Sequence, residues 1–287
     1  MKNIYKINYS LHSGGNNVKI IDCFTFYNEL KMLNFRLEEL NDYVDYFILV
    51  EANKTFAGND KEFYFETNKS KYTKFLDKII HIKVNDMPTD TDAWGRESFQ
   101  RNCISRGIKK LNLDNDDIII IGDLDEIPNK LILKDIKQSI LIINKIYKLS
   151  LMDLYYYNLT CKTEVKSSTS TILTYRNFKE NKYSPQDITR KYDEEKLPNY
   201  HHGWHFSYFF DSSKIINKIQ NFAHQEYNNS VYTNKDIITD NISKCKDLFG
   251  RDNLNWKYVA INENKNLPKN YKLLVGGNNK LNVEGII

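Results

Sequence analysis

The sequence predicts an α/β fold in which a mostly parallel sheet is flanked by helices. Four apolar runs have the length of buried strands, at residues 18–26, 46–50, 78–84 and 118–121. Between several of these runs, apolar residues recur at the spacing of a helix. Strands that alternate with helices favour a parallel sheet covered on both faces.

The elements expected in the first half follow one another closely. Strand 18–26 leads into a helix that begins at Asn28-Glu29 and carries Leu30, Leu33, Leu37 and Leu40 on one face. Strand 46–50 ends at Glu51, and strand 78–84 is followed by a turn around Met87-Pro88. A helix over 94–111 precedes strand 118–121.

The second half is less regular. It suggests a strand over 147–159, a loop-rich charged region to about 198, and a strand over 201–210. Helices are expected at 212–224 and 235–249, the latter with Gly250 as its C-cap. No repeat or Pro-rich linker divides the chain, so we expect one domain over 1–287 with a helical C-terminal extension and a loose tail, 261–287.

Composition excludes several classes of function. The 41 basic and 37 acidic residues leave a net charge of only +4, and the lysines are scattered, which argues against a nucleic-acid partner. No run reaches the roughly 18 apolar residues of a membrane span, and the N-terminus lacks a signal-peptide core. We therefore expect a soluble, cytoplasmic protein without a membrane span. No feature of the sequence predicts its oligomeric state.

The four cysteines are Cys23, Cys103, Cys161 and Cys245. They are far apart and lack the spacing of metal ligands, so they suggest neither a zinc site nor a disulfide framework. Free thiols are expected.

The most informative motif follows the isoleucine run. Asp123, Asp125 and Glu126 follow residues 118–121 after a single glycine, and ligands of open α/β sheets bind beyond the carboxyl ends of such strands. Adjacent carboxylates repel one another unless a cation or proton intervenes. A divalent ion is the simplest explanation, and oxygen ligands favour Mg²⁺ or Mn²⁺.

Three interpretations of these acids remain open. They could be a solvated turn that caps the next helix. A phosphatase of the haloacid-dehalogenase type also places Asp-x-Asp after an apolar strand, but here Glu126-Ile127 follow and the later acidic pair is missing. A nucleotide-sugar transferase would use the acids to hold a cation against the donor diphosphate. An EF-hand is excluded because its sixth position is not Gly.

Several ordered segments resemble glycosyltransferase family 17, which includes the bisecting N-acetylglucosaminyltransferases. The resemblance extends over roughly residues 18–255 and lies in the segments 22–29, 37–40, 44–45, 55–58, 122–128, 203–207, 222–226 and 247–251, with Glu51, Glu97, Arg101 and Lys218. Segment 160–200 matches no motif of the family, and the chain lacks the membrane anchor of the eukaryotic members. The acceptor therefore has no sequence signature.

The resemblance implies an A-type glycosyltransferase fold, Rossmann-like in its nucleotide-binding part, and inverting transfer from a UDP-sugar to a glycan acceptor. UDP-GlcNAc is the family precedent, and Mn²⁺ or Mg²⁺ is the implied cofactor. Residues 18–130 would then form the nucleotide-sugar half and residues 131–260 the acceptor and catalytic half. The alternative is a module that binds a nucleotide sugar or glycan without turnover.

Under this hypothesis the metal ligands are Asp123, Asp125 and His205, with His224 as the second choice for the third ligand. The residues expected to bind the donor are Phe26, Asn28, Glu29, Glu51, Arg101, Asn102 and Asp123. Each also has a plainer structural role. An acid that ends a strand can simply be solvated, a residue before a helix can be its cap, and a charged residue on a helix can face solvent.

An inverting transfer also needs a base that deprotonates the acceptor hydroxyl. Glu226 is the first candidate because it lies in a matching segment. Asp153 and Asp211 are rivals, although Asp211 precedes Ser212-Ser213 as a helix cap would. Aromatic residues such as Trp204, or the run 155–157, could stack on sugars or simply form the core.

Overall fold

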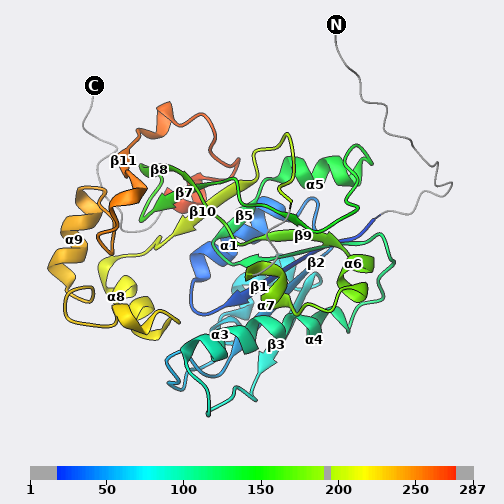
Figure 1. Cartoon of the computed structure of the whole chain (residues 1–287), viewed down its shortest axis with the longest axis horizontal. Helices are drawn as coiled ribbons and strands as arrows, with labels where there is room; N and C mark the ends of the chain where they lie inside the picture. The colour runs from blue at the N-terminus through cyan, green and yellow to red at the C-terminus, as the bar shows by residue number, and fades with distance from the viewer. Residues whose placement is uncertain (1–17, 191–194, 276–287) are drawn as a thin grey trace, which may run out of the picture.

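The computed structural model describes residues 18–190 and 195–275, which form a mixed α/β structure with two sheets (Figure 1). The first sheet has six strands in the order β3-β2-β1-β4-β9-β6. The strands are β1 (Ile20–Phe26), β2 (Tyr46–Ala52), β3 (Ile79–Val84), β4 (Ile118–Asp123), β6 (Tyr147–Lys148) and β9 (Thr171–Thr174). Strands β1 to β4 are parallel, as predicted, while β9 runs antiparallel to β4 and to β6.

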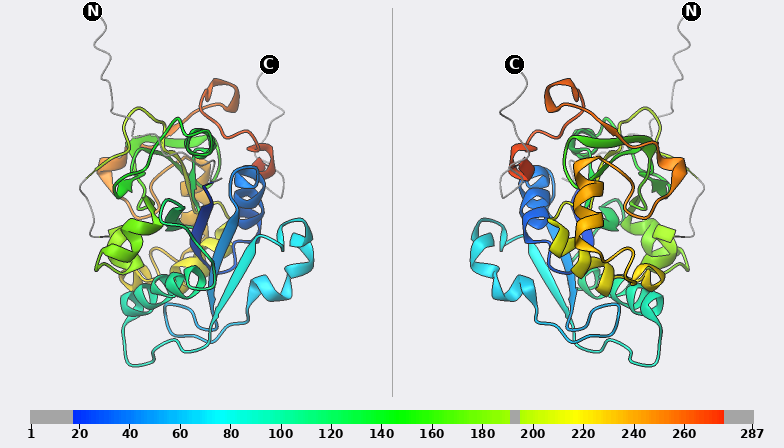
Figure 2. Two further views of the ribbon diagram at one scale, coloured as in Figure 1. Left: turned by 90° about the vertical axis from the view of Figure 1, so that its right-hand side faces the viewer. Right: turned by 90° about the vertical axis from the view of Figure 1, so that its left-hand side faces the viewer.

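Helices cover both faces of this sheet because its strands are apolar on both sides. Phe24 of β1 packs in one core with α1 (Leu30–Leu40) and α5 (Lys130–Lys137). Cys23, its neighbour, packs on the opposite face with α4 (Ile104–Ile108). Figure 2 shows α1 on one side of the strands, with α3 (Ala93–Asn102) and α4 on the other.

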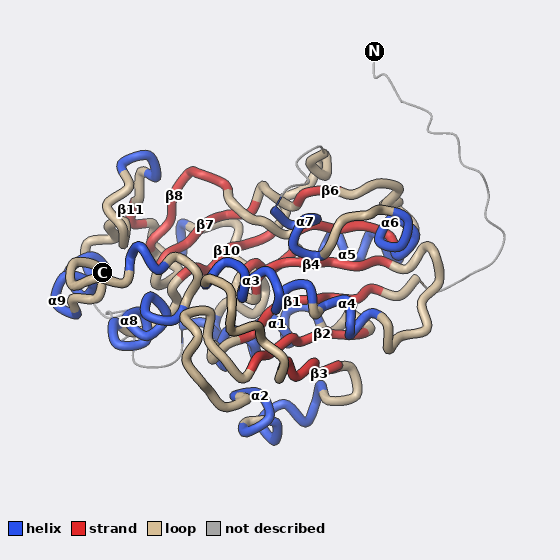
Figure 3. Tube along the Cα trace, turned by 60° about the horizontal axis from the view of Figure 1, so that its bottom comes forward, coloured by secondary structure: helices blue, strands red, loops and turns tan. Residues whose placement is uncertain are grey.

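The second sheet has five strands in the order β11-β8-β7-β10-β5. Figure 3 shows β8, β7 and β10 of this sheet side by side. They are β5 (Glu126–Pro128), β7 (Met152–Tyr156), β8 (Cys161–Lys166), β10 (Gly203–Ser207) and β11 (Lys257–Tyr258). Helices α8 (Ser212–Asn221) and α9 (Lys235–Ser243) pack against it through an apolar cluster that includes Ile215 and Ile238. The C-terminal extension is therefore part sheet and part helix.

The short elements complete the described chain. They are α2 (Tyr64–Thr67), η1 (Lys69–Phe75), α6 (Tyr175–Glu180), α7 (Pro185–Arg190), η2 (Gln225–Tyr227), η3 (Asp252–Leu254), η4 (Ile261–Glu263) and α10 (Lys272–Val275). Part of the expected loose tail is thus ordered, and Lys31 of α1 donates to the carbonyl of Leu274 at 2.7 Å. Residues 276–287 lie outside the described part.

Several boundaries differ from the prediction. The region 160–198, expected to be loop-rich, contains β8, β9, α6 and α7. The helix over 94–111 is two helices separated at Cys103, and the strand over 147–159 is the two strands β6 and β7. Helix α9 ends at Ser243, so Gly250 is not its C-cap. Gly250 instead occupies a later turn with φ +69°.

The expectation that all four cysteines are free thiols was wrong for Cys161 and Cys245. Cys161 of β8 and Cys245, just after α9, form a disulfide with a Cα–Cα distance of 5.3 Å. Cys23 and Cys103 are free and buried. Among residues 18–190 and 195–275, no helix is long and apolar enough to cross a membrane. The boundary between the halves 18–130 and 131–260 stays a prediction.

Candidate functional site

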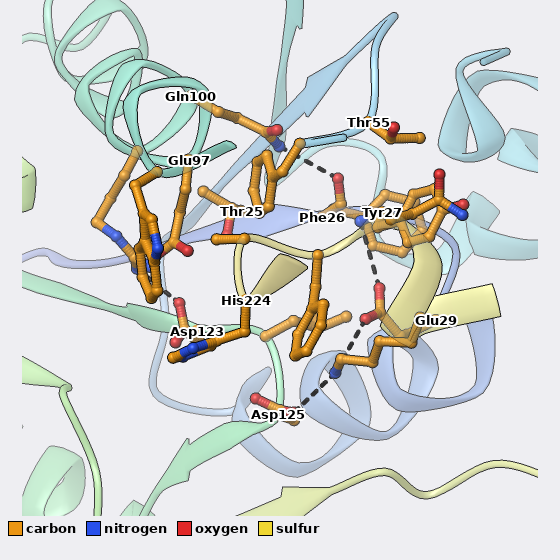
Figure 4. A pocket seen from close by; sticks show the side chains of 18 of the residues that line it. Thr25, Phe26, Tyr27, Glu29, Thr55, Glu97, Gln100, Asp123, Asp125 and His224 are labelled. Atoms are coloured by element: carbon orange, nitrogen blue, oxygen red, sulfur yellow. Dashed lines mark hydrogen bonds and ion pairs between the residues drawn. The ribbon is translucent and has the colours of Figure 1, made fainter. Parts of the chain in front are cut away.

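A cavity of about 310 Å³ opens at the carboxyl ends of β1 and β4 (Figure 4). Here the strand order reverses, because β1 pairs with β2 on one side and with β4 on the other. Such a switch point leaves a crevice beyond the strand ends, where ligands of α/β proteins bind. The residues proposed from the sequence that line it are Phe26, Glu29, Arg101, Asp123, Asp125, His205 and His224.

The turn that carries the acids is fixed by one buried arginine. Arg36 of α1 is fully buried and binds both carboxylate oxygens of Asp22, at 2.6 and 2.7 Å. Its Nη1 also donates to the carbonyl oxygens of Asp123, Leu124 and Glu126 at 2.8–3.0 Å. Because one guanidinium binds three carbonyls of the same turn, Arg36 sets the path of its backbone.

Glu126 fixes the turn from the opposite side. Its buried carboxylate accepts hydrogen bonds from the backbone N–H of Thr169 at 2.7 Å and the hydroxyl of Ser170 at 2.8 Å. It also accepts from the N–H of Asp123 at 3.3 Å. Because its oxygens are engaged within the protein, Glu126 is a positioning residue and not part of the cavity lining.

Asp123 is held by two arginines. Arg101 Nη1 lies 2.6 Å and Arg190 Nη2 lies 3.6 Å from its carboxylate. Burial alone would raise the pKa of Asp123, but the two guanidinium groups outweigh burial and hold that pKa below its usual range. Glu97 bridges the same pair of arginines, at 3.0 Å from Arg101 and 2.8 Å from Arg190. The result is a fixed network of two guanidinium groups and two carboxylates, whose formal charges balance.

Asp125 faces a third cation. Lys218 Nζ of α8 lies 3.4 Å from Asp125 and 3.5 Å from Glu29, so the ammonium bridges the two carboxylates (Figure 4). Burial lowers the pKa of Lys218, but these acids more than compensate and raise it above its usual value. The lysine is therefore charged at every physiological pH.

His205 of β10 points one ring nitrogen at Asp125. Its Nδ1 lies 3.2 Å from the carbonyl oxygen of Ser167, which can only accept, so Nδ1 carries the proton. Nε2 faces Asp125 Oδ1 at a distance of 3.8 Å. When the ring is neutral, Nε2 and this carboxylate could share a cation, and a carbonyl behind the ring is the usual support of a metal-binding histidine.

Glu51 is close to the cavity but does not line it. It is fully buried, accepts from the N–H of Phe65 at 3.2 Å, and lies 3.0 Å from His81. Its other neighbour is Lys61, at 3.5 Å, which does line the cavity. Burial lowers the pKa of Lys61 and Glu51 partly restores it. The predicted donor contact of Glu51 stays a prediction, and Lys61 links Glu51 to the cavity lining.

Two aromatic side chains, Trp94 and His224, line the cavity next to one another. Trp94, 42% exposed, meets His224 edge-to-face with ring centroids 4.4 Å apart. His224 Nδ1 lies 2.6 Å from Glu226, whose side chain is 56% exposed. Glu226 itself does not line the cavity. The hydrogen bond with His224 lowers the pKa of Glu226.

The remaining predicted residues lie outside the cavity lining. Asp153 is fully buried in β7, paired with Lys166 and, at 2.8 Å, with Lys162. Asn102 accepts from the N–H of Gln186 at 3.0 Å and so joins α3 to α7. The remaining two predicted residues, Asn28 and Asp211, line a neighbouring cavity.

No group of three or more His, Cys, Asp or Glu side chains in residues 18–190 and 195–275 is arranged to hold a metal ion. Asp125 and His205 form a pair, and Asp123 is occupied by the arginines. Two protein ligands are enough for Mg²⁺ or Mn²⁺ when substrate phosphates and water complete the coordination. The residues present therefore fit a metal that arrives with a phosphorylated substrate.

The sequence interpretation missed several cavity residues and one support. Arg190 and Lys61 both line the cavity. Arg190 lies in segment 160–200, which matches no family motif, and Lys61 lies in the loop after β2, where the sequence shows no motif either. Lys218 lay in a matching position but had no assigned role. Arg36 appeared as one polar residue on an apolar helix face, and that break in the helical pattern was the available signal.

Comparisons with known proteins identify the family of the chain. The profile of glycosyltransferase family 17 matches residues 8–272. The chain belongs to this family. Over 117 residues it is 30% identical to the β-1,4-mannosyl-glycoprotein 4-β-N-acetylglucosaminyltransferases of Rattus norvegicus and Homo sapiens. Each match covers 38% of this family 17 chain and 22% of the relative, so it spans about a fifth of the relatives' length.

One solved structure also resembles the family 17 chain. It is the bifunctional glycosyltransferase WbbM in its apo form, which is 9% identical with a TM-score of 0.29. The match covers 70% of this chain and 40% of WbbM. A likeness at this level carries no argument about the fold.

Proposed function

We propose that this family 17 protein is a metal-dependent, inverting glycosyltransferase with an A-type fold, which transfers N-acetylglucosamine from UDP-GlcNAc to a glycan. The observation that carries the proposal is the cavity beyond β1 and β4, whose lining combines Asp125 and His205 with the cationic side chains of Arg101, Arg190 and Lys218. Family membership and the names of the mammalian relatives support N-acetylglucosamine as the transferred sugar and a glycan as the acceptor.

The charges of the cavity suit a nucleoside diphosphate. Arg101 and Arg190 are oriented by Glu97 and Asp123, so their order does not depend on a bound ligand. Preorganised cations stabilise charge that develops in the transition state, because little reorganisation is needed at the moment of reaction. In this proposal Arg101 and Arg190 bind the diphosphate as it leaves the donor sugar.

Asp125 and His205 are the residues that would hold the metal. When bound there, a divalent cation would act as a Lewis acid that stabilises the leaving diphosphate. Lys218 would keep Asp125 in place and add positive charge beside the phosphates. In this proposal Asp123 orients Arg101 and Arg190, which is a different role from the metal ligation expected from the sequence.

The decisive experiment is thermal unfolding with UDP. We expect UDP to raise the melting temperature in Mn²⁺ but not in EDTA, with a stabilisation of about 2.7 kcal/mol at a hundredfold excess over Kd. Asp125→Ala should abolish the shift, whereas the surface variant Glu164→Gln, whose side chain is 77% exposed, should retain it. Equal protection in EDTA would rule out metal-dependent donor binding.

A panel of UDP-sugars with Mn²⁺, scored by UDP release, then tests turnover and donor choice, because donor hydrolysis needs no acceptor. Binding without release would favour the non-catalytic module. Release of phosphate from p-nitrophenyl phosphate would favour the phosphatase.

A further inference from the structure

A second cavity, of about 280 Å³, adjoins the first. Four residues line both cavities: Glu29, Asp125, Tyr208 and Lys218. Ligands in the two cavities would therefore meet at this junction. Transfer of a group between two molecules requires such a meeting point, with the reacting atoms about 3–3.5 Å apart.

The lining of the second cavity suits a sugar ring. Phe209 and Phe210 contribute aromatic surface, while Asn28, Asp211 and Lys214 contribute amide, carboxylate and ammonium groups. Apolar surface with a few convergent polar groups is typical of small-molecule sites. A pyranose has the matching chemistry, because its C–H face packs on aromatic rings and its hydroxyls bind the polar groups.

The backbone of the same cavity is strained at two aromatic residues. Tyr157 has φ +65° and Tyr208 has φ +56°. Among the non-glycine residues described, these are the aromatic ones with positive φ, and a bulky side chain is rare in that region. Strained residues persist where surrounding contacts enforce them, and they cluster at ligand sites. Both tyrosines line the second cavity.

One carboxylate at the junction, Glu29, has a fixed orientation, and from the sequence it was expected to bind the donor. Glu29 Oε2 accepts from the backbone N–H groups of Tyr27 and Asn28 at 3.3 and 3.1 Å. Oε1 lies 3.5 Å from Lys218, and the side chain is 12% exposed. Glu29 and Asp125 are the two carboxylates that line both cavities, and the proposed metal would occupy Asp125.

We propose that the second cavity takes the acceptor sugar and that Glu29 accepts the proton of its attacking hydroxyl. This inference rests on the proposed function. The acceptor oxygen bonds to the anomeric carbon of the donor while the bond from that carbon to the diphosphate oxygen breaks. The bonding electrons leave with UDP, and the hydroxyl proton moves to Glu29. Lys218 holds the carboxylate at the junction until the acceptor arrives.

The first test is Glu29→Gln, which keeps the shape of the side chain but cannot accept the proton. UDP release from UDP-GlcNAc should fall by about 10²-fold or more, as expected for loss of a general base. The thermal shift with UDP and Mn²⁺ should be unchanged, which also shows that the variant is folded. Glu164→Gln is the matched control, and Glu226→Gln tests the rival base.

The outcomes separate this inference from the proposed function. If UDP fails to protect the wild type, the proposed function is wrong. If UDP protects but Glu29→Gln retains turnover, or only Glu226→Gln loses it, the assignment of Glu29 is wrong. A loss of UDP protection in Glu29→Gln would make it a donor-binding residue and would also overturn the assignment.

The second test concerns the cavity. A panel of p-nitrophenyl glycosides of common hexoses is added to UDP-GlcNAc and Mn²⁺. At least one glycoside should accelerate UDP release, and Phe210→Ala should raise the KM for it at least about 10-fold while leaving the KM for the donor unchanged. If no glycoside accelerates release, or if both KM values change together, the second cavity is not the acceptor site.

Discussion

Arg36 and Asp22 form a fully buried, bidentate ion pair beneath the acidic turn, with separations of 2.6 and 2.7 Å. The pair joins α1 to β1, and the same guanidinium holds the carbonyl oxygens of the turn that carries Asp123 and Asp125. The position of these acids therefore depends on a residue that lies outside the cavity lining.

Arg36→Gln should destabilise the protein by about 3–5 kcal/mol, because it leaves Asp22 buried without its partner. Urea denaturation at pH 7 measures this loss. The double variant Asp22→Leu with Arg36→Met should recover much of the stability, since an apolar pair can replace a buried ion pair. It should not recover UDP protection, because the carbonyls of the turn lose the guanidinium that holds them. Full recovery of UDP binding would show that Arg36 contributes only to stability.

Asp123 and Asp125 should respond differently to metal. Asp125→Asn should weaken Mn²⁺-dependent UDP protection, whereas Asp123→Asn should retain the dependence on Mn²⁺, because Asp123 contacts Arg101 and Arg190 instead. Titration calorimetry of UDP with and without Mn²⁺ distinguishes the two. If Asp123→Asn abolishes the metal effect as completely as Asp125→Asn, the sequence prediction that both are ligands is correct.

His201 should make stability fall in mild acid. Burial, reinforced by Lys166 and Lys162, lowers the pKa of His201 from 6.5 to about 4. The unfolded chain then binds the proton more readily than the native protein, so stability rises with pH between about 4 and 6.5 and is constant above. The expected loss at pH 4 relative to pH 7 is up to about 3 kcal/mol. His201→Gln should remove this contribution, as measured by urea denaturation across that range.

The first half of the fold follows closely from the sequence because each strand is a continuous apolar run. The 118–121 run became β4, and the other runs became β1, β2 and β3, with shifts of a residue or two at their ends. The second sheet was harder to predict. In β8, buried residues such as Thr163 alternate with polar or exposed ones, and β5 has only three residues. Neither strand has the length or composition that pattern analysis recognises.

The candidate site also contains residues that the strand pattern predicts and residues that only the tertiary packing brings in. Phe26 and Asp123 could be placed together because parallel strands end at one edge of a sheet. The partners of these residues come from later segments, such as Arg190 of α7 and Lys218 of α8, whose positions depend on how the second half packs. Asp153 was proposed as a base by residue type alone, and its burial between lysines is a property of the tertiary structure.

The disulfide between Cys161 and Cys245 closes a long loop, with a sequence separation of 84 residues. Such a crosslink stabilises by restricting the unfolded chain, typically by about 2–4 kcal/mol. Reduction, or the double variant Cys161→Ser with Cys245→Ser, should therefore lower the melting temperature, while Cys103→Ala should keep the sensitivity to reductant. Thiol titration of the denatured, non-reduced protein should find the two thiols of Cys23 and Cys103. Four reactive thiols would contradict the pairing, and would agree with the expectation of free cysteines that the wide spacing suggested.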